Sequence, residues 1–169
     1  MRSHMRSQED LERLSQLHHE LPNDLEALEV RLTDPDPLVR FAVVSKLRQL
    51  KDPCAVNPLL HALEDESSDV RSSAALALSY YADARFLPVI IDHTAHDMSP
   101  GVRCMSAITA GSIGTDEAME AIRSALSDPD EHVRMTACYE VANRNDLRAL
   151  TEIRHLLSDT EDVVRSAAA

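Results

Sequence analysis

The stretch Asp128-Pro129-Asp130-Glu131-His132-Val133-Arg134 is one of five copies of a short pattern in this chain of 169 residues. In each copy an aspartate stands six residues before an arginine, and a valine directly precedes that arginine. The five pairs are Asp34 with Arg40, Asp65 with Arg71, Asp97 with Arg103, Asp128 with Arg134, and Asp159 with Arg165. Successive arginines are 31 or 32 residues apart. This period predicts a solenoid, in which each unit buries its apolar face against its neighbours.

The composition predicts that the units are helical. Apolar residues make up 44% of the chain but aromatic residues only 3%, so the core has to consist mainly of Leu, Val, Ile and Ala. The chain has three glycines and few stretches in which β-branched residues alternate with polar ones. Both features argue against a β-sheet.

Each unit divides into two expected helices. The first helices are expected at about 24–33, 54–64, 85–96, 116–127 and 146–158. The second helices are expected to begin at Asp36, Ser67, Ser99, Asp130 and Glu161, of which four are residue types that cap helices well. In the first helices we expect two columns of core residues. One column is Leu28, Leu59, Ile91, Ile122 and Ile153, and the other is Leu32, Leu63, Ala95, Leu126 and Leu157.

The organisation of the chain follows from these positions. Residues 1–6 are interpreted as a non-native remnant or a disordered N-terminus, and residues 7–22 as an N-terminal capping helix. The array then covers 23–169. Its units are 23–52, 53–83, 84–115, 116–145 and 146–169. The last unit stops soon after its second helix begins, which favours a fragment of a longer protein.

The pattern of Asp and Val-Arg in units of about 31 residues resembles the HEAT repeat, in particular the short HEAT-like form of phycobilisome lyases. The resemblance covers residues 24–169. It implies an all-α, right-handed α-solenoid of about five helix pairs behind the N-terminal helix. It also implies that the five aspartates and five arginines of the pattern form a ladder, since a partly buried guanidinium needs carboxylate or carbonyl acceptors. The third unit departs from the pattern, because Met98-Ser99-Pro100-Gly101 replaces the acidic turn and the unit is one residue longer.

The net charge of −12 limits the classes of partner. Phosphate and anionic lipid surfaces repel such a chain, so we expect neither nucleic acid nor membrane as a partner. A basic protein is favoured. No apolar run approaches the roughly 18 residues of a transmembrane helix. The three cysteines are far apart and form no CxxC motif, which predicts free thiols in the cytoplasm.

The best candidate for a binding site is a second face of the second helices, which we expect to line the concave surface. Apolar side chains are unexpectedly frequent there, and apolar clusters typically mark interaction surfaces. The candidate partner-binding residues are Leu38, Phe41, Leu76, Tyr80, Met105, Ile108, His132, Met135 and Tyr139. The alternative is that neighbouring second helices cover these side chains.

Evidence for catalysis is weaker. His61 and His93 share one column, and His96 follows three residues after His93, but no third metal ligand stands at a familiar spacing. We therefore expect surface histidines, no metal and no cofactor. A resemblance to the deoxyhypusine hydroxylases, di-iron enzymes with this fold, would require several His-Glu dipeptides, and the chain has only His19-Glu20. HEAT-like DNA glycosylases need a basic groove, which the charge excludes.

These observations predict a non-catalytic interaction scaffold that binds another protein on the concave face of its second helices. Two alternatives stay open. One is a dedicated inhibitor of the immunity-protein kind that neutralises a basic partner, and the other is a subunit of a bilin-lyase-like enzyme. The sequence assigns no partner by name and no oligomeric state.

Overall fold

The computed structural model describes residues 7–169, and in this range it contains helices and no strand. The prediction for residues 1–6 lies outside the described residues. The first helix, α1, is Gln8–Glu20. Five helix pairs follow, and we name their first and second members A helices and B helices. The pairs are α2 (Leu25–Arg31) with α3 (Pro37–Leu50), α4 (Val56–Ala62) with α5 (Ser68–Leu78), α6 (Leu87–His96) with α7 (Pro100–Ile113), α8 (Asp116–Ala125) with α9 (Glu131–Asn143), and α10 (Leu150–Leu156) with α11 (Asp162–Ala168).

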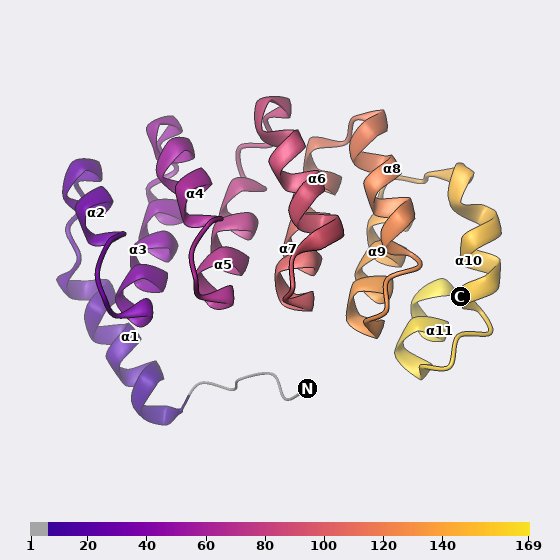
Figure 1. Ribbon diagram of the computed structural model, residues 1–169, viewed down its shortest axis with the longest axis horizontal. Helices are drawn as coiled ribbons and strands as arrows, with labels where there is room; N and C mark the ends of the chain where they lie inside the picture. Colours follow the sequence, from indigo (N-terminus) through magenta and orange to yellow (C-terminus); the bar gives the residue numbers. More distant parts are fainter. Residues whose placement is uncertain (1–6) are drawn as a thin grey trace.

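The pairs stand side by side in chain order, with the A helices in one row and the B helices in another (Figure 1). Short 3-10 helices precede three of the A helices, at Pro53–Ala55, Ala84–Phe86 and Leu147–Ala149. The prediction of an all-α solenoid of HEAT-like helix pairs is confirmed. None of the helices within residues 7–169 combines the length and the apolarity that a transmembrane segment needs.

The aspartate of the repeated pattern helps to start each B helix. Asp36 and Asp130 cap their helices with side-chain hydrogen bonds, as expected. Ser67 and Ser99 occupy the N-cap position without making such a bond. Their own N–H groups donate instead to the pattern aspartate two residues earlier, and this second bond recurs in all five units. The repeated aspartate therefore stabilises the turn even where the N-cap side chain makes no capping hydrogen bond.

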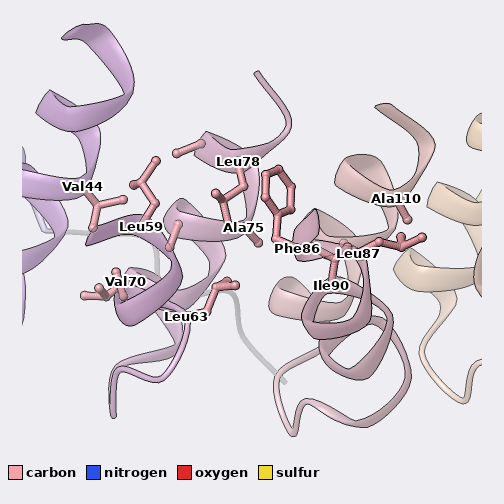
Figure 2. Packing of buried hydrophobic residues seen from close by; sticks show 14 of the residues in the cluster. Val44, Leu59, Leu63, Val70, Ala75, Leu78, Phe86, Leu87, Ile90 and Ala110 are labelled. Carbon is pink, nitrogen blue, oxygen red and sulfur yellow. The ribbon is translucent and has the colours of Figure 1, made fainter. Parts of the chain in front are cut away.

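Mostly aliphatic side chains form one core cluster, part of which is shown in Figure 2. The third unit departs from the predicted columns. There Ile90 and Thr94 are fully buried, whereas the predicted Ile91 is partly buried against the core and the predicted Ala95 is exposed, so the prediction for Ala95 is wrong. The extra residue of this unit lies between Thr94 and Asp97, at the end of α6, which moves the buried positions back by one residue.

The two ends of the array differ. At the N-terminal end, α1 packs on α3 with Leu17 and Leu21 in the core, and Arg13 forms an ion pair of 2.5 Å with Asp36. At the C-terminal end, the predicted core residue Leu157 is 47% exposed, although its counterpart Leu126 is only 2% exposed. Within residues 7–169 the prediction for Leu157 is therefore wrong.

Candidate functional site: the ladder and the B-helix face

The pattern arginines join neighbouring units. Each of the first four donates from Nε and Nη2 to the two carboxylate oxygens of the aspartate in the next unit, over 2.7–2.9 Å. The pairs are Arg40 with Asp65, Arg71 with Asp97, Arg103 with Asp128, and Arg134 with Asp159. Nη1 of each donates to the carbonyl oxygen of the aspartate in its own unit. One guanidinium therefore fixes its own turn and the next unit together.

Between the ends of the array, each aspartate and each arginine of the ladder already has a partner of opposite charge. Burial acts to raise the pKa of Asp97, but hydrogen bonds from Arg71 and from the Ser99 N–H outweigh it and leave that pKa below its usual value. The hydrogen bond from Arg134 likewise lowers the pKa of Asp159. Carboxylates and guanidinium groups that are occupied in this way have no capacity left for a substrate. We therefore interpret the ladder as a positioning element for the B helices.

The ladder ends differently at Asp34 and Arg165. The Asp34 carboxylate accepts the Asp36 N–H and lies 3.6 Å from Arg31. Arg165 donates to the carbonyl oxygens of Asp159 and Thr160 in its own unit and forms an ion pair with Asp162.

The predicted partner-binding residues, which lie on the B helices or, for Tyr80, just after α5, fall into three groups. Tyr80 and Tyr139 are 54% and 52% exposed, and His132 is also exposed. Leu76 and Ile108 are half-buried. The remaining four are half-buried and pack against the core: Leu38, Phe41, Met105 and Met135. The face is less open than its apolar content suggested, because each B helix packs against the next.

Tyr80 is held at the end of α5 by its neighbours. Its ring meets the Tyr81 ring edge-to-face at 5.4 Å between centroids, and the Lys51 ammonium lies 5.0 Å from its centroid. The Tyr81 hydroxyl donates to the Asp52 carbonyl oxygen over 2.9 Å. Tyr80 is thus oriented before any partner arrives, which reduces the entropy that binding costs.

A carboxylate that sequence reasoning missed lies beside Tyr139. Glu140 is half-buried, and burial raises the pKa of its carboxyl although Arg144 acts in the opposite sense. The carboxylate rests on Gly111 of α7, where a Cβ atom would collide with it. A glycine inside a helix was the signal in the sequence that another group approaches closely.

Exposed carboxylates also gather along the turns between the A and B helices, where the chain enters each B helix. The exposed carboxylates are those of Glu66, Asp69, Glu161 and Asp162, and the half-buried Glu131 lies at the corresponding place in the fourth unit. They lie at the N-terminal ends of the B helices, whereas Tyr80 and Tyr139 lie near the C-terminal ends. The B-helix face therefore has an acidic edge and an aromatic edge.

Two of the candidate histidines, His93 and His96, contact carboxylates. His93 lies 3.3 Å from Asp97 and 3.7 Å from Glu64, and His96 lies 2.9 Å from Asp92. Within residues 7–169, one group of three possible ligand atoms converges, and it belongs to the consecutive residues Asp130–His132 on the surface. His19 and Glu20 are not part of it. The donor set does not fit a di-iron site, and we derive no reaction step through one.

The repeat pattern and the fold agree with the comparisons. The chain matches the family of HEAT repeats over residues 25–103 and 87–169. It belongs to the HEAT repeat family. Human deoxyhypusine hydroxylase is 31% identical over 109 residues, which cover 63% of this chain and 36% of that protein. The Arabidopsis thaliana deoxyhypusine hydroxylase is 36% identical over 100 residues, covering 57% and 32%. The HEAT-repeat chain thus spans about a third of the length of these relatives.

Other similar proteins are parts of assemblies. A 26S proteasome non-ATPase regulatory subunit 1 homologue of Arabidopsis thaliana is 30% identical over 126 residues, covering 68% of this chain and 13% of that protein. A chain from the complex of CpcE and CpcF of phycocyanin lyase from Nostoc shares the fold, with a TM-score of 0.67, 22% identity and coverage of 94% and 96%. These findings support the coarser part of the partner prediction, which is that the partner is another protein.

The relatives correct two predictions. The chain was predicted to be a non-catalytic scaffold, with an inhibitor as an alternative, and not to be an enzyme. Four relatives are named deoxyhypusine hydroxylase, which is an enzyme, so both predictions are wrong. The number of His-Glu dipeptides was misleading, because this chain spans about a third of those relatives. Such a count does not test kinship with the enzyme.

Proposed function

We propose that this chain is the protein-binding component of an enzyme of the kind its relatives are named for. In this proposal its B-helix face holds a basic segment of the protein substrate while the enzyme modifies that protein. Kinship with deoxyhypusine hydroxylases supports the enzymatic part. The contacts of Tyr80 and the exposure of Tyr139 are the reason for assigning substrate binding to residues of this face.

The observation that carries the binding role is the exposure of Tyr80 and Tyr139 on a face whose other apolar side chains are at least half-buried. Tyrosine gives a large contact area for little loss of conformational entropy, and it is enriched among residues that dominate binding. Leu76 and Ile108 supply apolar surface on the same face.

Charge supports a basic substrate segment. The chain carries a net charge of −12, and exposed carboxylates follow one edge of the B-helix face. A cationic side chain that reaches the partly desolvated Glu140 would interact more strongly than with a fully hydrated carboxylate. The acidic edge would mainly speed the encounter, and the contacts at the tyrosines would slow dissociation.

The test is a calorimetric titration of the chain with a protein that bears deoxyhypusine. Tyr80→Ala and Tyr139→Ala should each weaken binding about tenfold, which corresponds to about 1.4 kcal/mol. Met98→Ala is the matched control, because Met98 is an exposed apolar residue outside the proposed site. Unchanged melting temperatures in all three variants would show that folding is intact.

The proposal fails if the protein does not bind, or if both tyrosine variants bind as tightly as the wild type. A pH series adds a second readout. Burial raises the pKa of free Glu140, and a bound cation would lower it, so binding should release protons. Affinity should then rise with pH as Glu140 ionises, and Glu140→Gln should remove this dependence.

A further inference from the structure

A group of cations lies at the C-terminal end of α3, although the chain carries a net charge of −12. Both lysines of the chain, Lys46 and Lys51, are found here together with Arg48. His18 of α1 lies beside them, and its Nε2 atom is 2.7 Å from the amide nitrogen of Gln49. We call Lys46, Arg48, Lys51 and His18 the basic cluster.

The basic cluster lacks the carboxylate partners that most arginines of the chain have, in the ladder and outside it. In the part of the chain that the structure describes, Lys46, Arg48 and Lys51 form no ion pair, and Lys51 contacts the Tyr80 ring instead. Lys46 is half-buried and precedes the last turn of α3, so the helix dipole does not account for it. Burial lowers the pKa of His18, and the neighbouring charges of Lys46 and Arg48 lower it further. A bound anion would offset this repulsion between cations.

The opposite charge occupies the same position at the other end of the B-helix face. Lys46 and Glu140 each stand six residues after the ladder arginine of their own unit. The helices that carry them, α3 and α9, are separated by α5 and α7 in the row of B helices (Figure 1). Tyr80 lies next to the cations, and Tyr139 directly precedes Glu140. The aromatic edge therefore runs from a cationic end at α3 to an anionic end at α9.

From this polarity we propose that the basic cluster binds an acidic stretch of the protein whose basic residues reach Glu140. The inference rests on the proposed function and deepens it, because it fixes the direction in which the substrate segment lies. Neighbouring helices pack about 8–10 Å apart, so the three steps from α3 to α9 span about 24–30 Å. An extended chain advances about 3.3 Å per residue, which places the acidic stretch about seven to nine residues from the basic one. A wholly basic segment would be repelled at α3.

The first experiment compares two synthetic peptides of equal length. One has a lysine block, a Gly-Ser spacer of about eight residues to match that span, and a glutamate block. In the other, glutamines replace the glutamates. Calorimetry should show that the glutamate peptide binds about fivefold more tightly. In nuclear magnetic resonance spectra, a spin label at its glutamate end should broaden the amides at the end of α3, and a label at its lysine end those of α9.

Arg48→Glu tests the basic cluster, and Arg154→Glu is its matched control. Both arginines are exposed and lie in the last turn of their helices, and over the described residues neither forms an ion pair. Arg48→Glu should remove the preference for the glutamate peptide, whereas Arg154→Glu should leave it unchanged. Equal effects of the two variants, or a glutamate-end label that broadens α9 and not α3, would overturn the proposal.

The outcomes separate this inference from the proposed function. If both peptides bind equally and Tyr80→Ala and Tyr139→Ala weaken both, the proposed function stands and the inference is wrong. If the glutamate preference persists and neither tyrosine variant weakens binding, the proposed function is wrong and the basic cluster remains a site for an acidic segment. If neither peptide binds, both are wrong. A short DNA duplex that displaces the glutamate peptide at a lower concentration than the peptide itself requires would assign the cluster to nucleic acid and overturn the inference.

Discussion

Replacing Arg103 with methionine should destabilise the array at its centre. The Arg103 and Asp128 side chains are both largely buried, and Arg103 makes two bonds of 2.8 Å to Asp128 and a third to the Asp97 carbonyl oxygen. Without the guanidinium, the Asp128 carboxylate stays in a partly desolvated site, where the Asp130 N–H still donates to it. Breaking a buried ion pair from one side costs about 3–5 kcal/mol. Because this pair keeps some contact with solvent, we expect about 3 kcal/mol.

The assay is urea unfolding followed by circular dichroism, combined with hydrogen exchange of α7 and α9. Exchange is needed because repeat arrays can open one interface at a time. A loss of about 3 kcal/mol corresponds to a fall in Tm of about 6–12 °C for a chain of this size. Amides of α7 and α9, which lie on the two sides of the Arg103–Asp128 pair, should lose protection from hydrogen exchange together.

Arg148→Met is the matched control. Arg148 also contacts two carboxylates, but its side chain is exposed, and Arg123 still donates to the buried Asp146 without it, so the loss should be about 0–1 kcal/mol. The reasoning is refuted if the Arg103 and Arg148 variants lose the same stability. It is also refuted if Arg103→Met leaves the exchange of α9 unchanged.

Three further outcomes are expected. The pKa of a ladder aspartate such as Asp97 is lower in the folded protein than in the unfolded chain, where it is about 4. The stability that this aspartate contributes is therefore complete above about pH 4 and is lost as the pH falls through the folded pKa. Circular dichroism during an acid titration should show a cooperative loss of helix below about pH 4. Gly111→Ala should displace the Glu140 carboxylate at little cost in stability, because the colliding atoms are the far end of a flexible side chain and alanine favours a helix over glycine by about 1 kcal/mol; a fall in Tm of more than about 4 °C in thermal melting would contradict this. Exposed Cys54 should react with an alkylating reagent in the folded protein, whereas Cys138, whose pKa burial raises to about 11, should react only on unfolding, as mass spectrometry can show.

The fold could be predicted because the repeat carries redundant information. Five aspartates six residues before five arginines set the period, and the residues between them predict where each B helix begins. The pairing of each arginine with the next unit's aspartate needed the structure, since spacing within one unit does not give the distance between two. The position of Thr94 in the core also needed it, because an alignment on the arginines cannot show where the extra residue is inserted.

The candidate site was harder to predict. A helical wheel places Phe41 and Met135 on the same face as Tyr80 and Tyr139, but the approach of the next B helix decides which of them stays accessible. The burial of the Glu140 carboxylate likewise depends on a neighbouring helix, since it lies against Gly111 of α7. The enzymatic kinship could not be obtained from motifs, since residues that support a fold are shared between proteins with different chemistry.

The most direct test of the account is to map the surface that a bound substrate contacts. An isotope-labelled chain is titrated with a deoxyhypusine-bearing protein, and amide shifts are followed by nuclear magnetic resonance. The account predicts that the largest changes lie on α5, α7 and α9, around Leu76, Tyr80, Ile108 and Tyr139. Changes confined to the A helices α4, α6 and α8 would contradict it.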